Sequence, residues 1–347
     1  MQQLSDCKEK IHSCSKCGLC QAVCPIYKIT GNDCTVSRGQ FIMLYGLLNG
    51  KLQMSKKINK YLDLCLKCGA CSKFCPSGID VVEIVALAKA EYFKQHKFEK
   101  IKSFIQKKLV FDFGLNFINF FHKKTESKKF DKKVIYFGGC SSKIRGNDSV
   151  IKILNRCGIE VITRNFDCCG IPFYVRGDLE TFKLCKDNFI QQIKNCGTTE
   201  VVTTCASCEK TLKSYNIDGI NIKNIFEYLA ENDIKMTLKK PQKVTFHKPC
   251  NINNYDEIKQ ILNNIDNLTY VEMENFDKCC GLNGVSKINE YKTMCKLFKE
   301  KRKNILNTEA ETVLTCCLGC EFALKLYSAF QYKVCDLTNF LEKNISD

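Results

Sequence analysis

Residues 14–25, CSKCGLCQAVCP, and residues 65–76, CLKCGACSKFCP, carry the same cysteine pattern. Three cysteines at i, i+3 and i+6 are spaced to hold three corners of one cubic 4Fe-4S cluster, and the fourth, followed by proline, is directed toward a second cluster. Each stretch therefore supplies three ligands to one cluster and one ligand to the other. The expected ligands are Cys14, Cys17, Cys20 and Cys75 for cluster 1, and Cys65, Cys68, Cys71 and Cys24 for cluster 2.

Zinc is the main alternative for these cysteines, because C-x-x-C pairs are common in tetrahedral structural zinc sites. A zinc ion takes only four ligands, whereas each run packs three cysteines into seven residues and adds a further Cys-Pro. That density favours a cubic iron–sulfur cluster. A disulfide framework is disfavoured, since such frameworks are typical of small secreted chains.

The chain has 347 residues, enough for two or three domains with separate cores. It contains 26 cysteines and begins MQQLSDCKEK, without the apolar run of a signal peptide. No stretch of about 18 consecutive apolar residues is present, so we expect no transmembrane segment. These features predict reduced thiols and a cytoplasmic location.

The formal net charge is +16 when every cysteine is counted as neutral. Cluster ligands are thiolates, and a 4Fe-4S cubane with four thiolates carries a net charge of roughly −2. Bound clusters would therefore offset much of the positive charge. No nucleic-acid recognition module accompanies the basic residues, and we expect no nucleic-acid partner.

Two apolar stretches accompany the cysteine runs. SRGQFIMLYGLLNG, residues 37–50, predicts a helix with Ser37 as its N-cap. DVVEIVALAKAEYF, residues 80–93, predicts a second helix capped by Asp80. With the two runs, these helices predict a small α-helical ferredoxin-type domain over residues 1–95 that holds two 4Fe-4S clusters.

Residues 96–132 are rich in lysine and predict a basic amphipathic linker. They contain LVFDFGLNFINFF at residues 109–121, flanked by KK and HKK. Two interpretations remain open for this segment: a helix that docks on a membrane surface or a partner, and a linker helix that packs on the next domain.

The sequence repeats itself beyond residue 132. VIYFGGC, a Cys-Cys-Gly triplet and VVTTCASC in the first copy correspond to VTFHKPC, a second Cys-Cys-Gly triplet and VLTCCLGC in the second, at offsets of 110 to 112 residues. The copies span residues 133–236 and 237–347. Short β-branched runs alternate with helical stretches in each copy, which indicates parallel α/β layers. We expect a duplicated α/β domain whose halves pack about a pseudo-twofold axis, with their cysteine sites near each other.

Five cysteines of each copy form the repeated pattern C, C-C-G, C-x-x-C. Ligands of parallel α/β sheets gather at the carboxyl ends of the strands, where Cys140, Cys205, Cys250 and Cys317 fall. Five thiolates exceed what one zinc ion uses, whereas adjacent cysteines can bridge different irons of a larger cluster. His247, in VTFHKPC, either donates a hydrogen bond to a cluster sulfur or is an ordinary packed or surface histidine.

The doubled C-C-G pattern behind two ferredoxin-type runs resembles the cysteine-rich CCG-domain iron–sulfur proteins. These include the iron–sulfur subunit of glycolate oxidase, the lactate-utilisation protein, the corresponding iron–sulfur subunit of anaerobic glycerol-3-phosphate dehydrogenase and the catalytic subunits of heterodisulfide reductase. The stretch from CSKCGLCQAVCPIY through SRGQ to CLKCGACSKFCPSG looks most like the glycolate oxidase subunit. That subunit often keeps one cysteine of the last pair, whereas this chain keeps Cys205 with Cys208 and Cys317 with Cys320, as heterodisulfide reductase subunits do.

The resemblance implies a noncubane 4Fe-4S cluster in one or both copies. The implied ligands are Cys140, Cys168, Cys169, Cys205 and Cys208 in the first copy, and Cys250, Cys279, Cys280, Cys317 and Cys320 in the second.

The resemblance also implies a function as the iron–sulfur electron-transfer subunit of a flavin-linked oxidoreductase for a 2-hydroxy acid such as glycolate or lactate. Such a subunit relays electrons from an FAD-containing partner to quinone or another acceptor. No G-x-G-x-x-G motif opens a βαβ unit, so we expect the flavin on the partner, no catalytic residue in this chain and no activity of the chain alone on the hydroxy acid. A peripheral contact with the inner face of the membrane accompanies this hypothesis.

The alternative function is that of a heterodisulfide or thiol–disulfide reductase catalytic subunit, in which noncubane clusters themselves split a disulfide. The chemistry would then lie at Cys168, Cys169, Cys279 and Cys280. The full five-cysteine sets favour this alternative.

Overall fold

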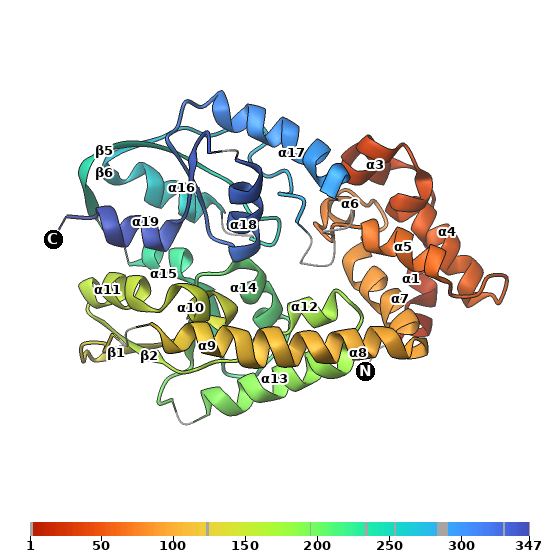
Figure 1. The fold of residues 1–347 in the computed structure, drawn as a ribbon, viewed down its shortest axis with the longest axis horizontal. Helices are drawn as coiled ribbons and strands as arrows, with labels where there is room; N and C mark the ends of the chain where they lie inside the picture. The colour runs from red at the N-terminus through yellow and green to blue at the C-terminus, as the bar shows by residue number, and fades with distance from the viewer. Residues whose placement is uncertain are drawn as a thin grey trace. The chain divides into compact units, whose positions relative to one another are not determined.

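The computed structural model describes residues 3–122, 125–194, 196–232, 235–252, 255–282, 291–328 and 330–346. The chain divides into two compact units, whose elements are labelled in Figure 1. Unit 1 combines Met1–Phe104, Pro172–Phe182 and Gly281–Lys299, and unit 2 combines Ile105–Ile171, Lys183–Cys280 and Glu300–Asp347. Unit 1 contains both ferredoxin-type runs, and unit 2 contains the ten cysteines of the two C, C-C-G, C-x-x-C patterns.

Short helices build the N-terminal part of unit 1. They are η1 (Leu4–Cys7), α1 (Lys8–His12), α2 (Leu19–Val23), α3 (Pro25–Thr30), η2 (Asp33–Thr35), α4 (Ser37–Leu48), α5 (Lys56–Leu64), α6 (Ala70–Lys73) and α7 (Val81–Gln95). The apolar faces of α4, α5 and α7 meet in one core, in which Leu44, Leu62 and Ile84 are wholly buried. Each such side chain contributes roughly 1.5–3 kcal/mol through burial. The expected helical character of this region is confirmed.

The two predicted N-caps have different outcomes. Asp80 caps α7 as expected, because its carboxylate accepts hydrogen bonds from the backbone N–H groups of Val82 (2.9 Å) and Glu83 (3.2 Å). The prediction for Ser37 was wrong by one position: Val36 is the N-cap of α4, and Ser37 is its first helical residue. The physical reason is that the Ser37 hydroxyl is engaged elsewhere, in a hydrogen bond with the Cys71 thiol.

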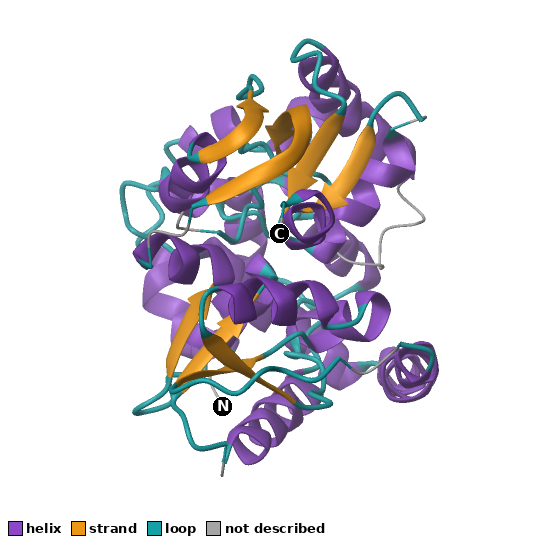
Figure 2. Ribbon diagram, turned by 90° about the vertical axis from the view of Figure 1, so that its left-hand side faces the viewer, coloured by secondary structure: helices purple, strands orange, loops and turns teal. Residues whose placement is uncertain are grey.

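Unit 2 contains two four-stranded parallel sheets with the same topology. The first has the order β2-β1-β3-β4 and the second the order β6-β5-β7-β8. The strands are β1 (Lys132–Tyr136), β2 (Ile159–Thr163), β3 (Glu200–Thr203), β4 (Asn221–Asn224), β5 (Met236–Phe246), β6 (Ile265–Tyr270), β7 (Thr312–Thr315) and β8 (Lys333–Asp336). Figure 2 shows the two sheets as separate groups of strands, each flanked by helices. The duplicated α/β fold is thus confirmed.

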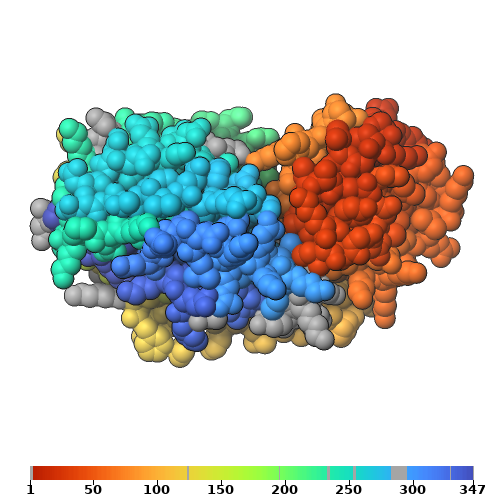
Figure 3. Space-filling view, turned by 90° about the horizontal axis from the view of Figure 1, so that it is seen from above, coloured from red at the N-terminus to blue at the C-terminus, as the bar shows by residue number. Residues whose placement is uncertain are grey.

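The helices of the first repeat are α10 (Gly139–Arg145), α11 (Asp148–Arg156), α12 (Ile171–Tyr174), α13 (Leu179–Ile193), α14 (Ala206–Lys213) and α15 (Ile225–Glu231). Those of the second are α16 (Tyr255–Asn263), α17 (Tyr291–Leu306), α18 (Leu318–Tyr327) and α19 (Leu337–Asn344). Figure 3 shows the surface that the second repeat, coloured cyan to blue, presents to solvent on one side.

The two repeats meet through corresponding helices. Helix α11 of the first repeat packs on α19 of the second, and α16, the counterpart of α11, packs on α15, the counterpart of α19. One continuous apolar core runs through both repeats, with wholly buried Leu154, Phe226, Leu262 and Leu341 among its members. This helix contact is therefore reciprocal, since equivalent pairs of helices make it twice.

A buried arginine links the repeats beside this core. The guanidinium of Arg145, at the end of α10, forms ion pairs with Asp336 (2.9 Å) and Glu321 of the second repeat. All three side chains are nearly inaccessible to solvent. Because Asp336 also caps α19 by accepting from the Thr338 N–H (3.1 Å), the arginine connects the first repeat to the last helix of the chain.

The segment after α7 continues as α8 (Lys97–Gln106), a π-helical stretch η3 (Lys107–Gly114) and α9 (Leu115–Phe120). Helix α9 packs on α10, its Leu115 is buried, and the His122 ring nitrogen Nε2 lies 3.0 Å from the Ile144 carbonyl oxygen. This part of the segment therefore packs on the first repeat, as one of the two interpretations expected. Its large apolar side chains nevertheless face solvent, including Leu109, Phe113, Phe117, Phe120 and Phe121.

The sequence predicted no transmembrane segment. Over the part of the chain that the structure describes, no helix has both the length and the apolar character that crossing a bilayer requires.

Candidate metal centres

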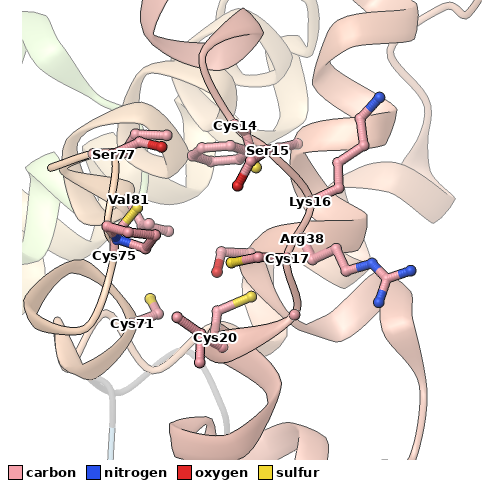
Figure 4. A pocket seen from close by; sticks show the side chains of 16 residues that line it. Cys14, Ser15, Lys16, Cys17, Cys20, Arg38, Cys71, Cys75, Ser77 and Val81 are labelled. Atoms are coloured by element: carbon pink, nitrogen blue, oxygen red, sulfur yellow. The ribbon is translucent and has the colours of Figure 1, made fainter.

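The first pocket of unit 1 is lined by cysteines from both ferredoxin-type runs. Figure 4 shows Cys14, Cys17 and Cys20 of the first run around this pocket together with Cys71 and Cys75 of the second. The structure thus brings the fourth cysteine of the second run to the three-cysteine loop of the first. This is the crossed arrangement that the spacing predicted for cluster 1.

The second pocket of unit 1 is the complement of the first. Cys65, Cys68 and Cys71 line it together with Cys24, the fourth cysteine of the first run. Cys71 lines both pockets, since it stands where they adjoin. All eight cysteines of the two runs are therefore placed in two adjacent sets that follow the expected division.

An unusual backbone conformation winds each run around its pocket. Lys16 and Lys67, at matching positions of the two runs, have left-handed φ angles of 58° and 53°, and the glycines two residues later, Gly18 and Gly69, have φ angles of 86° and 73°. A left-handed lysine costs roughly 1–2 kcal/mol. Backbone strain of this size is characteristic of functional sites. Here the left-handed conformation turns three cysteines of each run toward one centre.

The spacing of the sulfur atoms argues against zinc in unit 1. Four sulfurs bound to one zinc ion lie about 3.8 Å apart, because the Zn–S bond is about 2.3 Å and the geometry is tetrahedral. Among the residues that the structure describes, one set of three metal-ligating atoms lies within 4.8 Å of one another, and it belongs to unit 2. The described cysteines of unit 1 form no such set.

Burial raises the pKa of two of these thiols, Cys24 and Cys71. Burial, with the nearby Cys65 thiol, raises the pKa of Cys71 to about 12. Burial likewise raises the pKa of Cys24, although the N–H of Tyr27 donates to its sulfur at 3.5 Å. Binding of a metal centre must therefore displace protons from these thiols.

The first repeat gathers its five cysteines by the strand ends. Cys140 follows β1, and Cys205 is the N-cap of α14 directly after β3. Hydrogen bonds join the thiols in the order Cys140, Cys168, Cys169, Cys208, Cys205. The N–H of Gly170 also donates to the Cys168 sulfur at 3.4 Å. The five residues expected from the sequence are thus together, and the expected position at the carboxyl ends of the strands is confirmed.

The polarity of these hydrogen bonds distinguishes the thiols. Hydrogen bonds from Cys168 and Cys208 hold the pKa of Cys169 well below its ordinary value. Hydrogen bonds to Cys140 and Cys169 raise the pKa of Cys168 well above it. One sulfur of the adjacent pair is therefore prepared to be a thiolate, the form that binds metals.

In the second repeat the structure connects Cys317, Cys320 and Cys280 in the same manner. Cys317 is the N-cap of α18 directly after β7, and Cys320 forms hydrogen bonds with both Cys317 and Cys280. Cys279 adjoins Cys280 in the chain, and Cys250 follows β5. The second set therefore occupies the same place in its sheet as the first.

The two sets of cysteines touch. The thiols of Cys205 and Cys317, which are counterparts in the two repeats, form a hydrogen bond, and the Ala206 N–H donates to the Cys316 carbonyl at 3.1 Å. The Ser207 hydroxyl lies 3.7 Å from the Cys317 sulfur. A continuous path of sulfur atoms therefore runs from one repeat to the other.

Two residues of the second site are polar and deeply buried. His247, at the end of β5, is fully buried, and burial, together with the charge of Lys301, holds its pKa well below the ordinary value. Burial lowers the pKa of Lys301 to about 8, although Cys279 and Cys280 raise it. The sequence left two interpretations of His247 open, a hydrogen-bond donor to a cluster sulfur and an ordinary packed or surface histidine. It did not indicate Lys301, which is one of many lysines in α17.

Comparison with protein families identifies the domains. A model of the 4Fe-4S dicluster domain matches residues 10–79, and a model of the cysteine-rich CCG domain matches residues 134–213 and again residues 244–325. The chain belongs to the CCG-domain iron–sulfur proteins. The family resemblance expected from the sequence is confirmed, and each CCG match contains the five cysteines of its repeat.

Relatives of this CCG-domain protein carry names of oxidoreductase subunits. One subunit of the fumarate reductase (CoM/CoB) of Methanothermobacter marburgensis is 28% identical and matches 91% of this chain over 68% of its own length. The probable glycolate oxidase iron–sulfur subunit of Bacillus subtilis is 24% identical, over 90% of this chain and 88% of its own length. The same identity and the same coverage hold for one subunit of the dihydromethanophenazine:CoB–CoM heterodisulfide reductase of Methanosarcina acetivorans.

A solved structure shares the fold of this CCG-domain protein. A hypothetical protein from Helicobacter pylori aligns with a TM-score of 0.55 at 14% identity, covering 89% of this chain and 68% of the other. The likeness extends to the fold alone.

Proposed function

We propose that the chain is the iron–sulfur electron-transfer subunit of a flavin-linked 2-hydroxy acid oxidoreductase, which relays electrons from an FAD-containing partner to quinone or another acceptor in the cytoplasm. The observation that carries the proposal is that one chain contains two cysteine-lined pockets, in unit 1, and two cysteine sets that contact each other, in unit 2. Relatives named as glycolate oxidase iron–sulfur subunits support the substrate class.

Two cubane 4Fe-4S clusters are proposed for unit 1, each held by thiolates of both runs. Cys14, Cys17, Cys20 and Cys75 hold cluster 1, and Cys65, Cys68, Cys71 and Cys24 hold cluster 2. The two pockets support this assignment, because each is lined by all four cysteines of one set. When bound, such clusters carry single electrons.

A noncubane 4Fe-4S cluster is proposed for each repeat of unit 2. The ligands are Cys140, Cys168, Cys169, Cys205 and Cys208 in the first, and Cys250, Cys279, Cys280, Cys317 and Cys320 in the second. We further propose a pseudo-twofold axis between the repeats, which the reciprocal packing of α11 on α19 and α16 on α15 supports. Cys205 and Cys317, whose thiols form a hydrogen bond, would then lie beside the axis and would each hold one of two neighbouring one-electron centres.

The isolated chain is expected to oxidise no 2-hydroxy acid. Removing hydride from a carbon requires a two-electron cofactor, which a flavin supplies and one-electron iron–sulfur centres do not. Adding the flavoprotein partner should restore electron flow from glycolate or lactate to a quinone analogue. The change in quinone absorbance on reduction measures this flow. The same assay with partner alone is the control. Oxidation of the acid by the chain without any partner would contradict the proposal.

A heterodisulfide reductase activity is the second candidate, and the retention of both C-x-x-C pairs favours it. A relative is named as part of such an enzyme. In this function Cys168, Cys169, Cys279 and Cys280 adjoin the reacting disulfide. Reduction of a heterodisulfide by the chain alone with a one-electron donor would establish this candidate in place of the relay.

We also propose that the chain binds the inner face of the membrane peripherally through the apolar side chains Leu109, Phe113, Phe117, Phe120 and Phe121. Each of them is more than half exposed, an unusual density for water-facing surface. The segment is basic, and the chain has a formal net charge of +16. This charge suits anionic lipid headgroups, while the aromatic rings suit the interface beneath them.

Replacing both Phe113 and Phe117 by serine should weaken binding to vesicles that contain anionic lipid by at least about tenfold, since each buried aromatic ring contributes roughly 1.5–3 kcal/mol. Vesicle flotation measures the effect. The matched control replaces Phe322 and Phe330, two exposed phenylalanines of the second repeat, and should leave binding unchanged. Equal binding of all three proteins, or binding by none, would contradict the membrane contact and leave a protein partner as the occupant of this surface.

A further inference from the structure

The side chain of His247 is buried without a hydrogen-bond partner. Its backbone is fixed by β7, since its N–H donates to the Leu314 carbonyl at 2.8 Å and its carbonyl accepts from the Thr315 hydroxyl at 3.2 Å. Neither imidazole nitrogen has a hydrogen-bond partner among the described residues, although the residue is wholly inaccessible to solvent. An unsatisfied buried polar group costs roughly 1–3 kcal/mol, so a partner for this imidazole is expected.

The imidazole lies against the cysteines of the second repeat. One ring nitrogen and the sulfur atoms of Cys280 and Cys320 are all within 4.8 Å of one another. Histidine is the commonest metal ligand of proteins, and a ring N–H can also donate to a cluster sulfur. The missing partner of His247 is therefore to be sought at the centre that these sulfurs hold.

Among the described residues of the first repeat, the position that matches His247 is a phenylalanine. Phe137 stands three residues before Cys140, as His247 stands three residues before Cys250. Phe189 stands 16 residues before Cys205, as Lys301 stands 16 residues before Cys317. In the first repeat the two positions form a buried aromatic pair, with ring centroids 5.3 Å apart.

The second repeat replaces this aromatic pair by two buried polar residues. Lys301 is only 4% exposed and donates to the carbonyls of Asn275 and Phe276 (3.2 Å to the latter). The charge of its ammonium lowers the pKa of His247. The thiols of Cys279, Cys280 and Cys320 in turn raise the pKa of Lys301. The two repeats therefore share the cysteine pattern and differ at these two matched positions: both are aromatic in the first repeat, and both are polar, one of them a lysine, in the second.

We propose that a ring nitrogen of His247 contacts the metal centre of the second repeat directly, as a ligand or as a hydrogen-bond donor to a cluster sulfur, and that the first centre has no equivalent contact. The inference rests on the proposed iron–sulfur centres. A ring N–H that donates to a cluster sulfur and a nearby ammonium would both favour the more negative, reduced form of a bound cluster. The second centre would then have a higher reduction potential than the first.

The contact is tested on the anaerobically purified chain labelled with ¹⁵N at histidine. Pulsed electron paramagnetic resonance of the second centre should show hyperfine coupling to one ¹⁵N nucleus, strong for a ligand and weak for a hydrogen bond. The chain has only four histidines, so assignment is direct. Iron retained in the second repeat without any histidine coupling would overturn the contact alone, whereas a second repeat that holds no iron would overturn the proposed centre as well.

Two matched variants test the difference between the repeats. His247→Phe installs the residue of the first repeat and should abolish the ¹⁵N coupling and shift the midpoint potential of the second centre downward, with the iron content retained. Phe137→His, the reciprocal variant, changes the first repeat and should leave the coupling and potential of the second centre unchanged. An unaltered potential in His247→Phe would overturn the proposal, and the wild-type coupling decides it even if this variant fails to fold.

Discussion

Replacing Arg145 by methionine is expected to lower the free energy of unfolding of unit 2 by about 3–5 kcal/mol, because it leaves the buried Asp336 carboxylate without its cation. Glu321 loses one of its two cations and keeps Lys325 at 2.6 Å. Arg145 is 13% exposed, and its partners Asp336 and Glu321 are 2% and 9% exposed. Methionine retains most of the apolar part of the arginine side chain, so the loss of stability measures the contribution of the guanidinium charge. Thermal and urea unfolding, followed by far-ultraviolet circular dichroism, measure the change.

The matched control for Arg145 is Lys152→Met. Lys152 also forms an ion pair across the repeats, with Glu342 at 2.6 Å, but its side chain is 54% exposed. An exposed pair contributes roughly 0–1 kcal/mol. Equal losses in the two variants would mean that Arg145 is not a buried link between the repeats.

Single serine substitutions should remove iron from one unit and leave the other unit loaded. Cys71→Ser deletes a proposed ligand in the pockets of unit 1, where Cys71 lines both, and should abolish the cubane signals in electron paramagnetic resonance. Cys280→Ser should abolish the signal of the second repeat and retain the cubanes. Electron transfer from the flavoprotein should fall to background in Cys71→Ser, since the relay is interrupted.

Cys157→Ser is the control for both substitutions. The Cys157 thiol donates to the Ile153 carbonyl at 3.0 Å, a hydrogen bond that serine can keep, and it belongs to neither pocket and neither five-cysteine set. It should retain every signal. Loss of all signals in a folded Cys71→Ser or Cys280→Ser chain would contradict the assignment of separate centres to the two units.

Local spacing explains why much of the site could be predicted from the sequence. The three cysteines of each ferredoxin-type run lie within seven residues, so the backbone between them determines where they point, and the pockets agree with the expected sets. The strand ends are likewise local features, and Cys205 and Cys317 follow their strands as expected. The internal repeat also predicted the common topology of the two sheets.

Features that depend on packing between distant segments could not be predicted. The hydrogen bond between Cys205 and Cys317 joins residues more than a hundred positions apart, and nothing in either motif specifies it. Lys301 lies in a helix with several lysines, and only the fold shows that this one is buried. Ser37 was expected to cap its helix from propensity alone, whereas its hydroxyl forms a hydrogen bond with the thiol of Cys71, in the second run.

The central claim is that one chain carries four iron–sulfur centres, two in each unit. The most direct test is the determination of iron, sulfide and zinc per chain in anaerobically purified protein, with Mössbauer spectroscopy to separate cubane from noncubane sites. Four centres of four irons each predict about 16 iron and no stoichiometric zinc. About eight iron, all in cubane sites, would contradict the centres of unit 2, and zinc in place of iron would contradict the account as a whole.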